Sequence, residues 1–303
     1  HTNIPKLYGS HATFRSFLFG PEMNEAALGG QVDGTNTGIV PTMSLLAASD
    51  DWVIVGRLID FQVSLVARKD AGVKKISDLK GKTVAVPFGG GSHPYVLQRF
   101  REHGLTVGEG PGEVHLINLK PSEQPIAMEK GAVHAVGTWE PQTAIIVGRG
   151  LGVVIDGCRH VGFLTVTKKL AKEHPEEIIA LLKAYVEANY FVTKRRKQTD
   201  AWFAKESGFE QNLIDRIRVI EPNLKAQTIR AINIRVTQDD IALTQKVADV
   251  MHAADLLPRP VRVASRVDMS YLDRAMADLK RHGYKTKQVR VRDATAQSAK
   301  SGG

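Results

Sequence analysis

The sequence predicts an α/β fold made of two similar lobes with a ligand cleft between them. The first observation is a module that occurs twice, as residues 30–41 and again as residues 131–141. Each copy follows a short helix that a glycine ends, and each runs through a strand into a proline that opens a new helix. The second observation is the alternation of strands and helices, which is typical of α/β proteins. Two such modules would direct two helix N-termini, with their unpaired N–H groups, at one shared cleft.

The individual elements follow from local residue patterns. Closely spaced β-branched and apolar residues predict strands, while a run of glycines at 89–91 leads into a helix that Gly104 ends. Ser122 is a candidate N-cap for a second short helix. In chain order we expect a helix over 22–28, strands over 52–56, 62–68 and 83–87, a helix over 95–103, a strand over 114–119, a helix over 123–130, and strands over 133–138 and 153–156.

The pattern changes after residue 163. Residues 163–167 are one more strand, and from Pro175 onward the apolar residues follow the spacing of long helices. The strand-rich middle of the chain therefore indicates a lobe inserted into another lobe that both chain ends build. We expect lobe 1 over residues 1–68 and 161–284, lobe 2 over residues 69–160, a basic flexible tail over residues 285–303, and crossings between the lobes near Val66–Gly72 and Gly157–Phe163.

Composition excludes several classes of protein. The 303 residues contain a single cysteine, Cys158, which excludes an internal disulfide and a cysteine-based zinc cluster. No run approaches the roughly 18–20 apolar residues of a membrane span. The net charge of +9 is concentrated after residue 280, where Asp293 is the only acid, so it indicates a solvated tail. We expect no nucleic-acid partner, no metal and no cofactor, because the histidines are dispersed and no recognition helix or aromatic platform accompanies the charge.

Four segments in order then resemble one known family: Ile76–Gly89 (ISDLKGKTVAVPFG), Gly91–Tyr95 (GSHPY), Val133–Pro141 (VHAVGTWEP) and Thr165–Glu176. They are similar to the periplasmic solute-binding proteins of ABC importers for nitrate, taurine and aliphatic sulfonates, whose superfamily also contains pyrimidine-precursor binders. The resemblance covers residues 21–190 and, more weakly, continues to residue 257. It implies the type II periplasmic-binding-protein fold, in which a ligand lies between two lobes.

The chain departs from the family at two places. Residues 1–15 do not resemble the opening strand and helix of the family, so either the start is truncated or the first lobe is built differently. That opening normally supplies ligand contacts. His134 stands where the family usually has aspartate, whereas the first module keeps Asp33 at the equivalent position.

The turn that precedes the helix at residue 95 supplies one group of candidate ligand contacts. Gly91 lets backbone N–H groups approach an anion closely, and the Ser92 hydroxyl can donate a further hydrogen bond. Ser92 can equally be a simple N-cap. His93 can donate to an oxyanion or only pack against its neighbours. The segment is not a phosphate-binding loop, because no Gly-Lys-Ser/Thr follows it.

The two modules supply the remaining candidates. Thr37, Gly38 and Thr42 surround the first proline, and Thr138, Trp139 and Glu140 surround the second. Threonine hydroxyls there can reach ligand oxygens, and the indole can form a wall against a carbon skeleton. The carboxylate can pair with a ligand ammonium group, or it can act only as a favourable acid at a helix N-terminus. The indole can likewise belong to the core of a lobe.

The leading hypothesis is a binding protein without catalytic residues that delivers a small oxyanion-bearing solute to an ABC permease. A sulfonate or a taurine-like compound is the first candidate for this solute, and nitrate, another small organic anion such as an aromatic carboxylate, and pyrimidines follow. Segments Arg68–Gly72 and Gly157–Gly162 would form the hinge. We expect a monomer in the periplasm, either free or anchored to the membrane through a lost N-terminus. One alternative is an enzyme on the same scaffold, of the desulfinase or pyrimidine-precursor synthase type. Cys158-Arg159-His160 supplies a thiol, a cation and an imidazole in sequence, but adjacent residues need not face each other, so we expect Cys158 not to be catalytic. Another alternative is the effector-sensing domain of a regulator.

Overall fold

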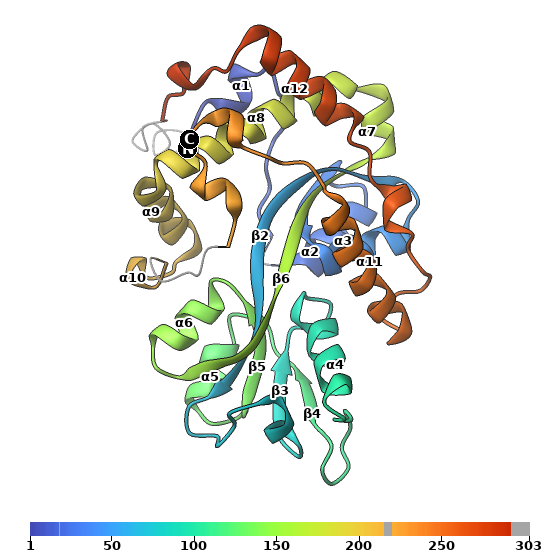
Figure 1. The fold of residues 1–303 in the computed structure, drawn as a ribbon, viewed down its shortest axis with the longest axis vertical. Helices are drawn as coiled ribbons and strands as arrows, with labels where there is room; N and C mark the ends of the chain where they lie inside the picture. The colour runs from blue at the N-terminus through green and yellow to red at the C-terminus, as the bar shows by residue number, and fades with distance from the viewer. Residues whose placement is uncertain (18, 215–219, 292–303) are drawn as a thin grey trace, which may run out of the picture.

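A computed structural model describes residues 1–17, 19–214 and 220–291. One mixed sheet of six strands runs through both lobes, in the spatial order β1-β6-β2-β5-β3-β4 (Figure 1). The strands are β1 (Gly34–Gly38), β2 (Trp52–Arg68), β3 (Thr83–Val86), β4 (His115–Asn118), β5 (Ala135–Trp139) and β6 (Gly152–Thr167). The α/β fold with two lobes that the sequence predicts is thus confirmed.

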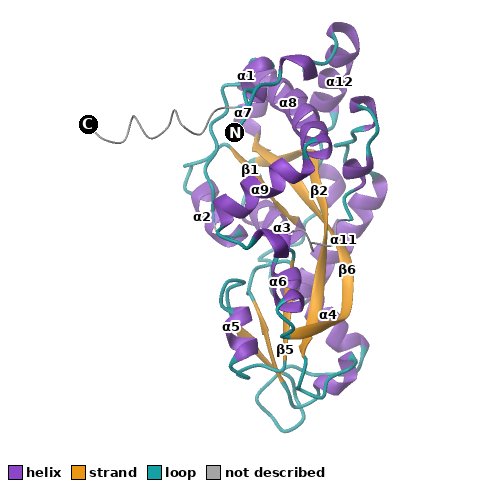
Figure 2. Ribbon diagram, turned by 90° about the vertical axis from the view of Figure 1, so that its left-hand side faces the viewer, coloured by secondary structure: helices purple, strands orange, loops and turns teal. Residues whose placement is uncertain are grey.

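Two long antiparallel strands connect the lobes. β2 and β6 pair from Trp52↔Thr167 to Arg68↔Gly152 and pass through the middle of the molecule in both views (Figures 1 and 2). The expectation of separate strands within each of these segments is wrong. Arg57 and Asp60 lie in the stretch between the two strands expected there, but ion pairs satisfy their side chains, so β2 continues through it.

The first crossing between the lobes lies earlier in the chain than expected. Val63–Ala67 pair with β5, so Val66–Gly72 lies within the second lobe, where β2 ends at Arg68 and a turn follows. The chain therefore passes between the lobes in the middle of β2, opposite residues 157–162 of β6. Because β2 and β6 are shared by both lobes, the limits of lobe 1 and lobe 2 stay a prediction.

The first lobe, at the top of Figure 1, is mostly helical. Its helices are α1 (Ile4–Leu7), α2 (Gly20–Leu28), α3 (Ile39–Ala48), α7 (Lys168–Glu173), α8 (Pro175–Lys194), α9 (Arg196–Ser207), α10 (Gln211–Ile214), α11 (Gln238–Ala253) and α12 (Ser270–His282). Ile178, Leu182 and Val186 recur every four residues along α8, so one face of this helix packs into a core with α12. A second core lies between α3 and α11.

The second lobe, at the bottom of Figure 1, has the sheet between helices. Those helices are α4 (Ser92–Glu102), α5 (Gln124–Glu129) and α6 (Gln142–Gly148). β3 pairs in parallel with both β4 and β5. Val96 and Phe100 of α4 pack with β2 and β3, and Met128 of α5 and Ile146 of α6 form a separate core with β3 and β5. Short 3₁₀ helices complete the fold: η1 (Ile76–Leu79), η2 (Pro222–Lys225), η3 (Ile229–Ala231), η4 (Val263–Arg266) and η5 (Thr286–Gln288).

The modules that the sequence shows twice differ in detail. Pro41 is the third residue of α3, within its first turn, whereas Pro141 stands just before α6 and follows a cis peptide bond from Glu140. The helix expected over 95–103 begins three residues earlier, at Ser92, because a proline at position 94 is tolerated in a first turn.

The two ends of the described chain lie together on α8. Tyr8 donates a hydrogen bond to Glu187 of α8 at 2.6 Å and accepts one from the N–H of Lys285 at 3.0 Å. Thr2 and Val291 form an isolated antiparallel bridge. Residues 1–17 therefore contribute a short helix and no strand of the sheet. Residues 292–303 of the predicted tail lie outside the described residues.

Candidate ligand-binding site

A cavity of about 1060 Å³ lies between the lobes and extends along the first lobe. Five of the predicted site residues line it, namely Thr37, Gly38, Gly91, Trp139 and Glu140. The part between the lobes is completed by Phe19, Gly20, Pro41, Ile59, Phe61 and Gly90. The two modules therefore meet across one cleft, although they lie far apart along the chain.

Two helices of the site begin at glycines that line the cavity. Gly38 is the N-cap of α3 and Gly91 is the N-cap of α4, and these helices have 10 and 11 residues. The first N–H groups of a helix have no partner within it and carry a partial positive charge. In these helices Pro41 and Pro94 have no N–H, and the His93 N–H donates to the Gly90 carbonyl at 3.1 Å, so the first residues of each helix supply the remaining donors. An anion between the lobes would thus face one helix N-terminus from each lobe, without a Cβ atom in the way.

The second module supplies a different environment. The Glu140 carboxylate accepts a hydrogen bond from the N–H of Ala144, in the first turn of α6, at 3.1 Å. A carboxylate of the protein itself therefore stabilises this helix N-terminus. The site is asymmetric as a result, with two helix N-termini open to the cavity and a third that an acidic side chain covers.

Aromatic rings form the wall and the floor of the cleft. A Cβ atom on Gly90 would lie 2.9 Å from the Trp139 ring, and one on Gly38 would lie 3.0 Å from the Phe61 ring. Both rings therefore pack directly on the backbone of the glycine turns. They offer the apolar surface that a ligand with a carbon skeleton needs.

Sequence reasoning missed Phe61, together with Ile59 and Phe19. The available signal was the alternation Ile59-Asp60-Phe61, in which the outer two residues of a strand share one face. The expectation of a break between two strands at this point hid that signal.

Four predicted site residues do not line the cavity. Thr42, Ser92 and Thr138 are 0 % exposed, and the Ser92 hydroxyl donates a hydrogen bond to the carbonyl of Gly137 at 2.9 Å. That bond ties the start of α4 to β5. His93 stacks on Phe88 with 4.4 Å between ring centroids, and burial lowers the pKa of His93. These side chains lie behind the glycine turns rather than in front of them.

The cavity continues along the free edge of β1. The Thr167 N–H bonds to the carbonyl of Asp33, so alternation along the antiparallel pair points the backbone groups of Gly34, Asn36 and Gly38 away from β6. The other walls come from the segment His11–Phe17 and from apolar residues that include Leu164, Val166, Ile178 and Leu181. Polar and charged side chains, among them Arg15, Asp33 and Glu177, line this part of the cavity beside the apolar ones.

Cys158 lies outside the main cavity. It lines a separate pocket of about 250 Å³ between α4 and α11. Burial, reinforced by the negative charge of Asp156, raises the pKa of Cys158 to about 12. Burial lowers the pKa of His160 to about 4, and its Nδ1 is 4.0 Å from the thiol. At neutral pH this arrangement holds a protonated thiol beside a neutral imidazole.

The lobes also touch at the mouth of the cleft. Gly89 of the second lobe approaches Pro21 of the first, so that an added Cβ atom would lie 3.2 Å from the proline ring. Beside them the Lys120 ammonium lies 3.5 Å from the Glu22 carboxylate. Near α6 and α10, Arg149 and Glu210 form a second ion pair between the lobes, at 2.9 Å.

Side chains of the metal-ligating types are dispersed over the described part of the chain. There, no three side chains among His, Cys, Asp and Glu come together as a metal-binding group. Across the same residues, no helix combines the length and the apolar character needed to cross a bilayer.

The fold and this cleft together define a two-lobed solute-binding protein of the type II periplasmic class. Residues 8–205 match the model of the NMT1-like family, and the chain belongs to that family. The chain is 29% identical over 275 residues to the "Putative aliphatic sulfonates-binding protein" of Escherichia coli strain K12. The aligned region covers 88% of this chain and 82% of the relative. It is 28% identical over 195 residues to the taurine-binding periplasmic protein of the same organism, in an alignment that covers 60% of this chain and 58% of the relative.

Solved structures show the same fold. The alkanesulfonate-binding protein SsuA from Xanthomonas axonopodis pv. citri, bound to MOPS, superimposes with a TM-score of 0.67 at 21% identity and covers 84% of this chain and 87% of its own. A mutant of DSZB in complex with biphenyl-2-sulfinic acid superimposes with a TM-score of 0.65 at 14% identity, covering 91% and 93%. At these identities the likeness concerns the fold alone.

Proposed function

We propose that this chain is the solute-binding component of an ABC importer, and that its lobes close on a small organic oxyanion, a sulfonate or a taurine-like compound. One observation carries the proposal: the N-termini of α3 and α4, one from each lobe, open at Gly38 and Gly91 into the same cavity. Two partial positive charges that approach from opposite lobes favour an anion most when the lobes are together. The names of the sulfonate-binding and taurine-binding relatives support the same solute class.

The proposed contacts follow from the walls of the cleft. N–H groups at the starts of α3 and α4, with the Thr37 hydroxyl, bind the oxyanion. Phe61 and Trp139 enclose the carbon skeleton, and Glu140 lies where it can meet a ligand ammonium group. Ser92, His93, Thr42 and Thr138 then support the turns from behind instead of contacting the ligand.

Closure would bend the molecule where β2 and β6 cross between the lobes. The contacts at the mouth, including the Lys120–Glu22 ion pair, would form on closure and break on opening. We further propose that the protein acts as a monomer in the periplasm and hands its ligand to a permease. The periplasmic location of the taurine-binding relative supports this placement.

We also propose that the chain does not transform its ligand. A nucleophilic cysteine needs a thiolate near the substrate. Cys158 lines a different pocket, and its raised pKa of about 12 keeps the thiol protonated at neutral pH.

The test compares four compounds by thermal shift and calorimetry: 1-hexanesulfonate, taurine, nitrate and 1-hexanol. Hexanol has the same tail as hexanesulfonate but no oxyanion. A ligand at a hundred times its Kd stabilises the native state by about 2.7 kcal/mol. We expect a stabilising shift with hexanesulfonate, none with hexanol, and an unchanged NMR spectrum of the ligand after long incubation. Equal shifts with both, or none at all, would refute the oxyanion proposal, and consumption of the ligand would show an enzyme.

A further inference from the structure

The floor of the cleft is one face of β2. Ile59 and Phe61 line the cavity, while Asp60 between them is 7 % exposed and points to the opposite face. The pairing of β2 with β6 shifts register between Arg57 and Ile59, which marks a bulge beside the site. Bulges of this kind redirect side chains, so the position of the floor depends on what holds the bulged strand.

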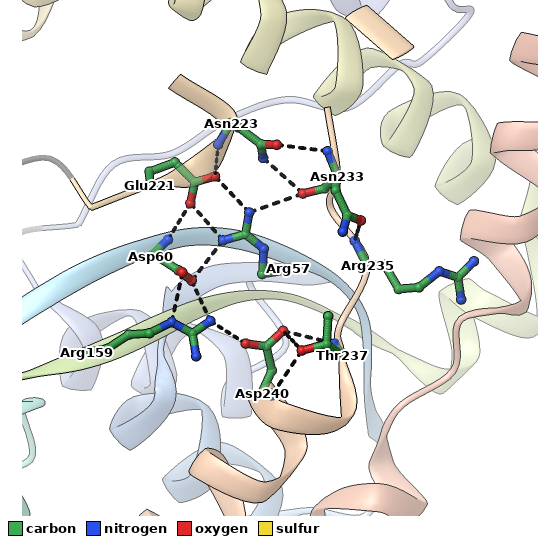
Figure 3. A network of polar contacts seen from close by, with 9 residues as sticks. All are labelled: Arg57, Asp60, Arg159, Glu221, Asn223, Asn233, Arg235, Thr237 and Asp240. Carbon is green, nitrogen blue, oxygen red and sulfur yellow. Dashed lines mark hydrogen bonds and ion pairs between the residues drawn. The ribbon is translucent and has the colours of Figure 1, made fainter. Parts of the chain in front are cut away.

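Behind the floor, Glu221 of the first lobe holds β2 through Arg57, which is a residue of that strand (Figure 3). The Arg57 guanidinium donates two hydrogen bonds to the Glu221 carboxylate, both 2.7 Å, and one to Asp60 at 2.8 Å. The backbone N–H of Asp60 donates to the same Glu221 carboxylate at 2.6 Å. All three side chains are buried. The backbone of the residue between Ile59 and Phe61 is thus fixed directly.

Arg159 extends this arrangement to β6 and α11. Its guanidinium donates to both oxygens of Asp60, at 2.8 and 2.9 Å, and also to Asp240. Asp240 in turn accepts from the N–H of Thr237 at 2.9 Å, where the two residues cap the start of α11. We call Arg57, Asp60, Arg159, Glu221 and Asp240 the crossing network. It joins both connecting strands to two segments of the first lobe (Figure 3).

The residue after Arg159 returns to the front of the sheet. His160 is 1 % exposed and packs on the Phe61 ring with 5.6 Å between centroids. A Cβ atom on Gly91 would lie 3.6 Å from the same imidazole. A displacement of Arg159 therefore moves the support beneath both Phe61 and the start of α4.

We propose that Asp60 and Arg159 are positioning residues for ligand binding: their paired hydrogen bonds hold the crossing of β2 and β6 so that Phe61 and Gly91 keep the shape of the cavity floor. This inference rests on the proposed function, because it concerns the same site. Neither residue lines the main cavity, so each acts on a ligand only through the strands it holds.

The test variant is Arg159→Lys, which keeps the charge and loses the planar, two-point contact with Asp60. Its matched control is Arg99→Lys. Arg99 also pairs with an aspartate of β6, Asp156, through its Nε, and like Arg159 it lines the separate pocket. It differs in lying on α4 and in bonding to Asp156 and Glu102 instead of Asp60 beneath the floor. Melting temperatures of both variants show whether each has lost comparable stability.

Two readouts then test positioning. The first is the Kd for 1-hexanesulfonate, which we expect to rise about tenfold in Arg159→Lys and to stay within twofold in Arg99→Lys. The second needs no ligand: the His160 ring resonance at pH 7, assigned by its loss in His160→Gln, reports the position of the neighbouring Phe61 ring. We expect this resonance to move in Arg159→Lys and not in the control.

The outcomes separate the two proposals. If the wild-type protein binds no sulfonate, the proposed function fails, while the His160 resonance still tests positioning. An Arg159→Lys protein that melts like the control, with an unmoved His160 resonance and an unchanged Kd, overturns the positioning role. Equal losses of affinity in both variants overturn it as well, because they would show an effect of stability alone.

Discussion

Reversing the charge of Lys120 should shift the protein toward the open state. Lys120 follows β4 in the second lobe, and Glu22 lies in α2 of the first, with 3.5 Å between the charged atoms. At that distance two unit charges attract by about 1 kcal/mol in water. The side chains are 54% and 34% exposed, which reduces the net contribution to about 0.2–1 kcal/mol.

Lys120→Glu replaces this attraction by repulsion, so the closed state should lose about 1 kcal/mol at low salt. That free energy corresponds to a roughly fivefold change in the ratio of closed to open molecules. Small-angle X-ray scattering of the ligand-free protein measures the shift, and the apparent Kd for 1-hexanesulfonate should rise by up to the same factor. Lys130→Glu, at the exposed end of α5, is the matched control for net charge.

The exchange variant Lys120→Glu/Glu22→Lys restores opposite charges and should recover the wild-type behaviour. In 1 M salt the Debye length falls to about 3 Å, and the difference between wild type and Lys120→Glu should disappear. The reasoning is refuted if Lys120→Glu and Lys130→Glu behave alike at low salt. It is equally refuted if the exchange variant stays as open as Lys120→Glu.

Three further changes test other parts of the structure. Gly90→Ala places a methyl group 2.9 Å from the Trp139 ring, so the Kd for 1-hexanesulfonate, measured by calorimetry, should rise about tenfold. The rise should be smaller in a Trp139→Phe background. A rise of the same size in both backgrounds would contradict the clash with the indole. Tyr8→Phe leaves the buried Glu187 carboxyl without the hydroxyl that donates to it at 2.6 Å, and should lower the free energy of unfolding in urea by about 1–3 kcal/mol. A loss of less than about 0.5 kcal/mol would contradict this role. Burial lowers the pKa of His160 from 6.5 to about 4, so between these pH values the unfolded chain binds a proton that the folded chain does not. Stability should therefore fall by up to about 3 kcal/mol as the pH falls through this window, and His160→Gln should remove that part of the pH dependence in denaturant titrations.

Local signals predict the parts of the site that act through the backbone. Gly38 and Gly91 stand immediately before helices, and a glycine at that place is visible within a few residues of sequence. Side-chain direction is not local in the same way. Ser92 and Thr138 adjoin lining residues, yet they point into the second lobe, because the turn of α4 and the alternation of β5 decide which neighbour faces the cleft.

The middle of β2 shows why the rest could not be predicted. Arg57 and Asp60 interrupt an apolar run, and by themselves such residues indicate the end of a strand. Their partners Glu221 and Arg159 come from segments far along the chain, and only the folded structure brings them together. Once paired, these buried charges are compatible with a continuous strand. The expected break, and with it the absence of Phe61 from the predicted site, has this single cause.

The electrostatics of the cleft constrain what it can select. Among the described residues that line the cavity, Arg15 is the sole arginine and no lysine takes part. Arg15 donates to Gln31 at 2.9 Å and lies over the Phe17 ring, away from the two glycine turns. In the proposed binding mode an oxyanion would therefore be bound by helix N-termini and the Thr37 hydroxyl instead of a cationic side chain. Each N-terminus contributes typically about 0.3–1 kcal/mol at exposed sites and more where water is excluded. Water is excluded only when the lobes close over the aromatic rings. Recognition of the charged end and burial of the carbon skeleton are then coupled through closure, so a bare anion should bind more weakly than the same anion on an apolar tail.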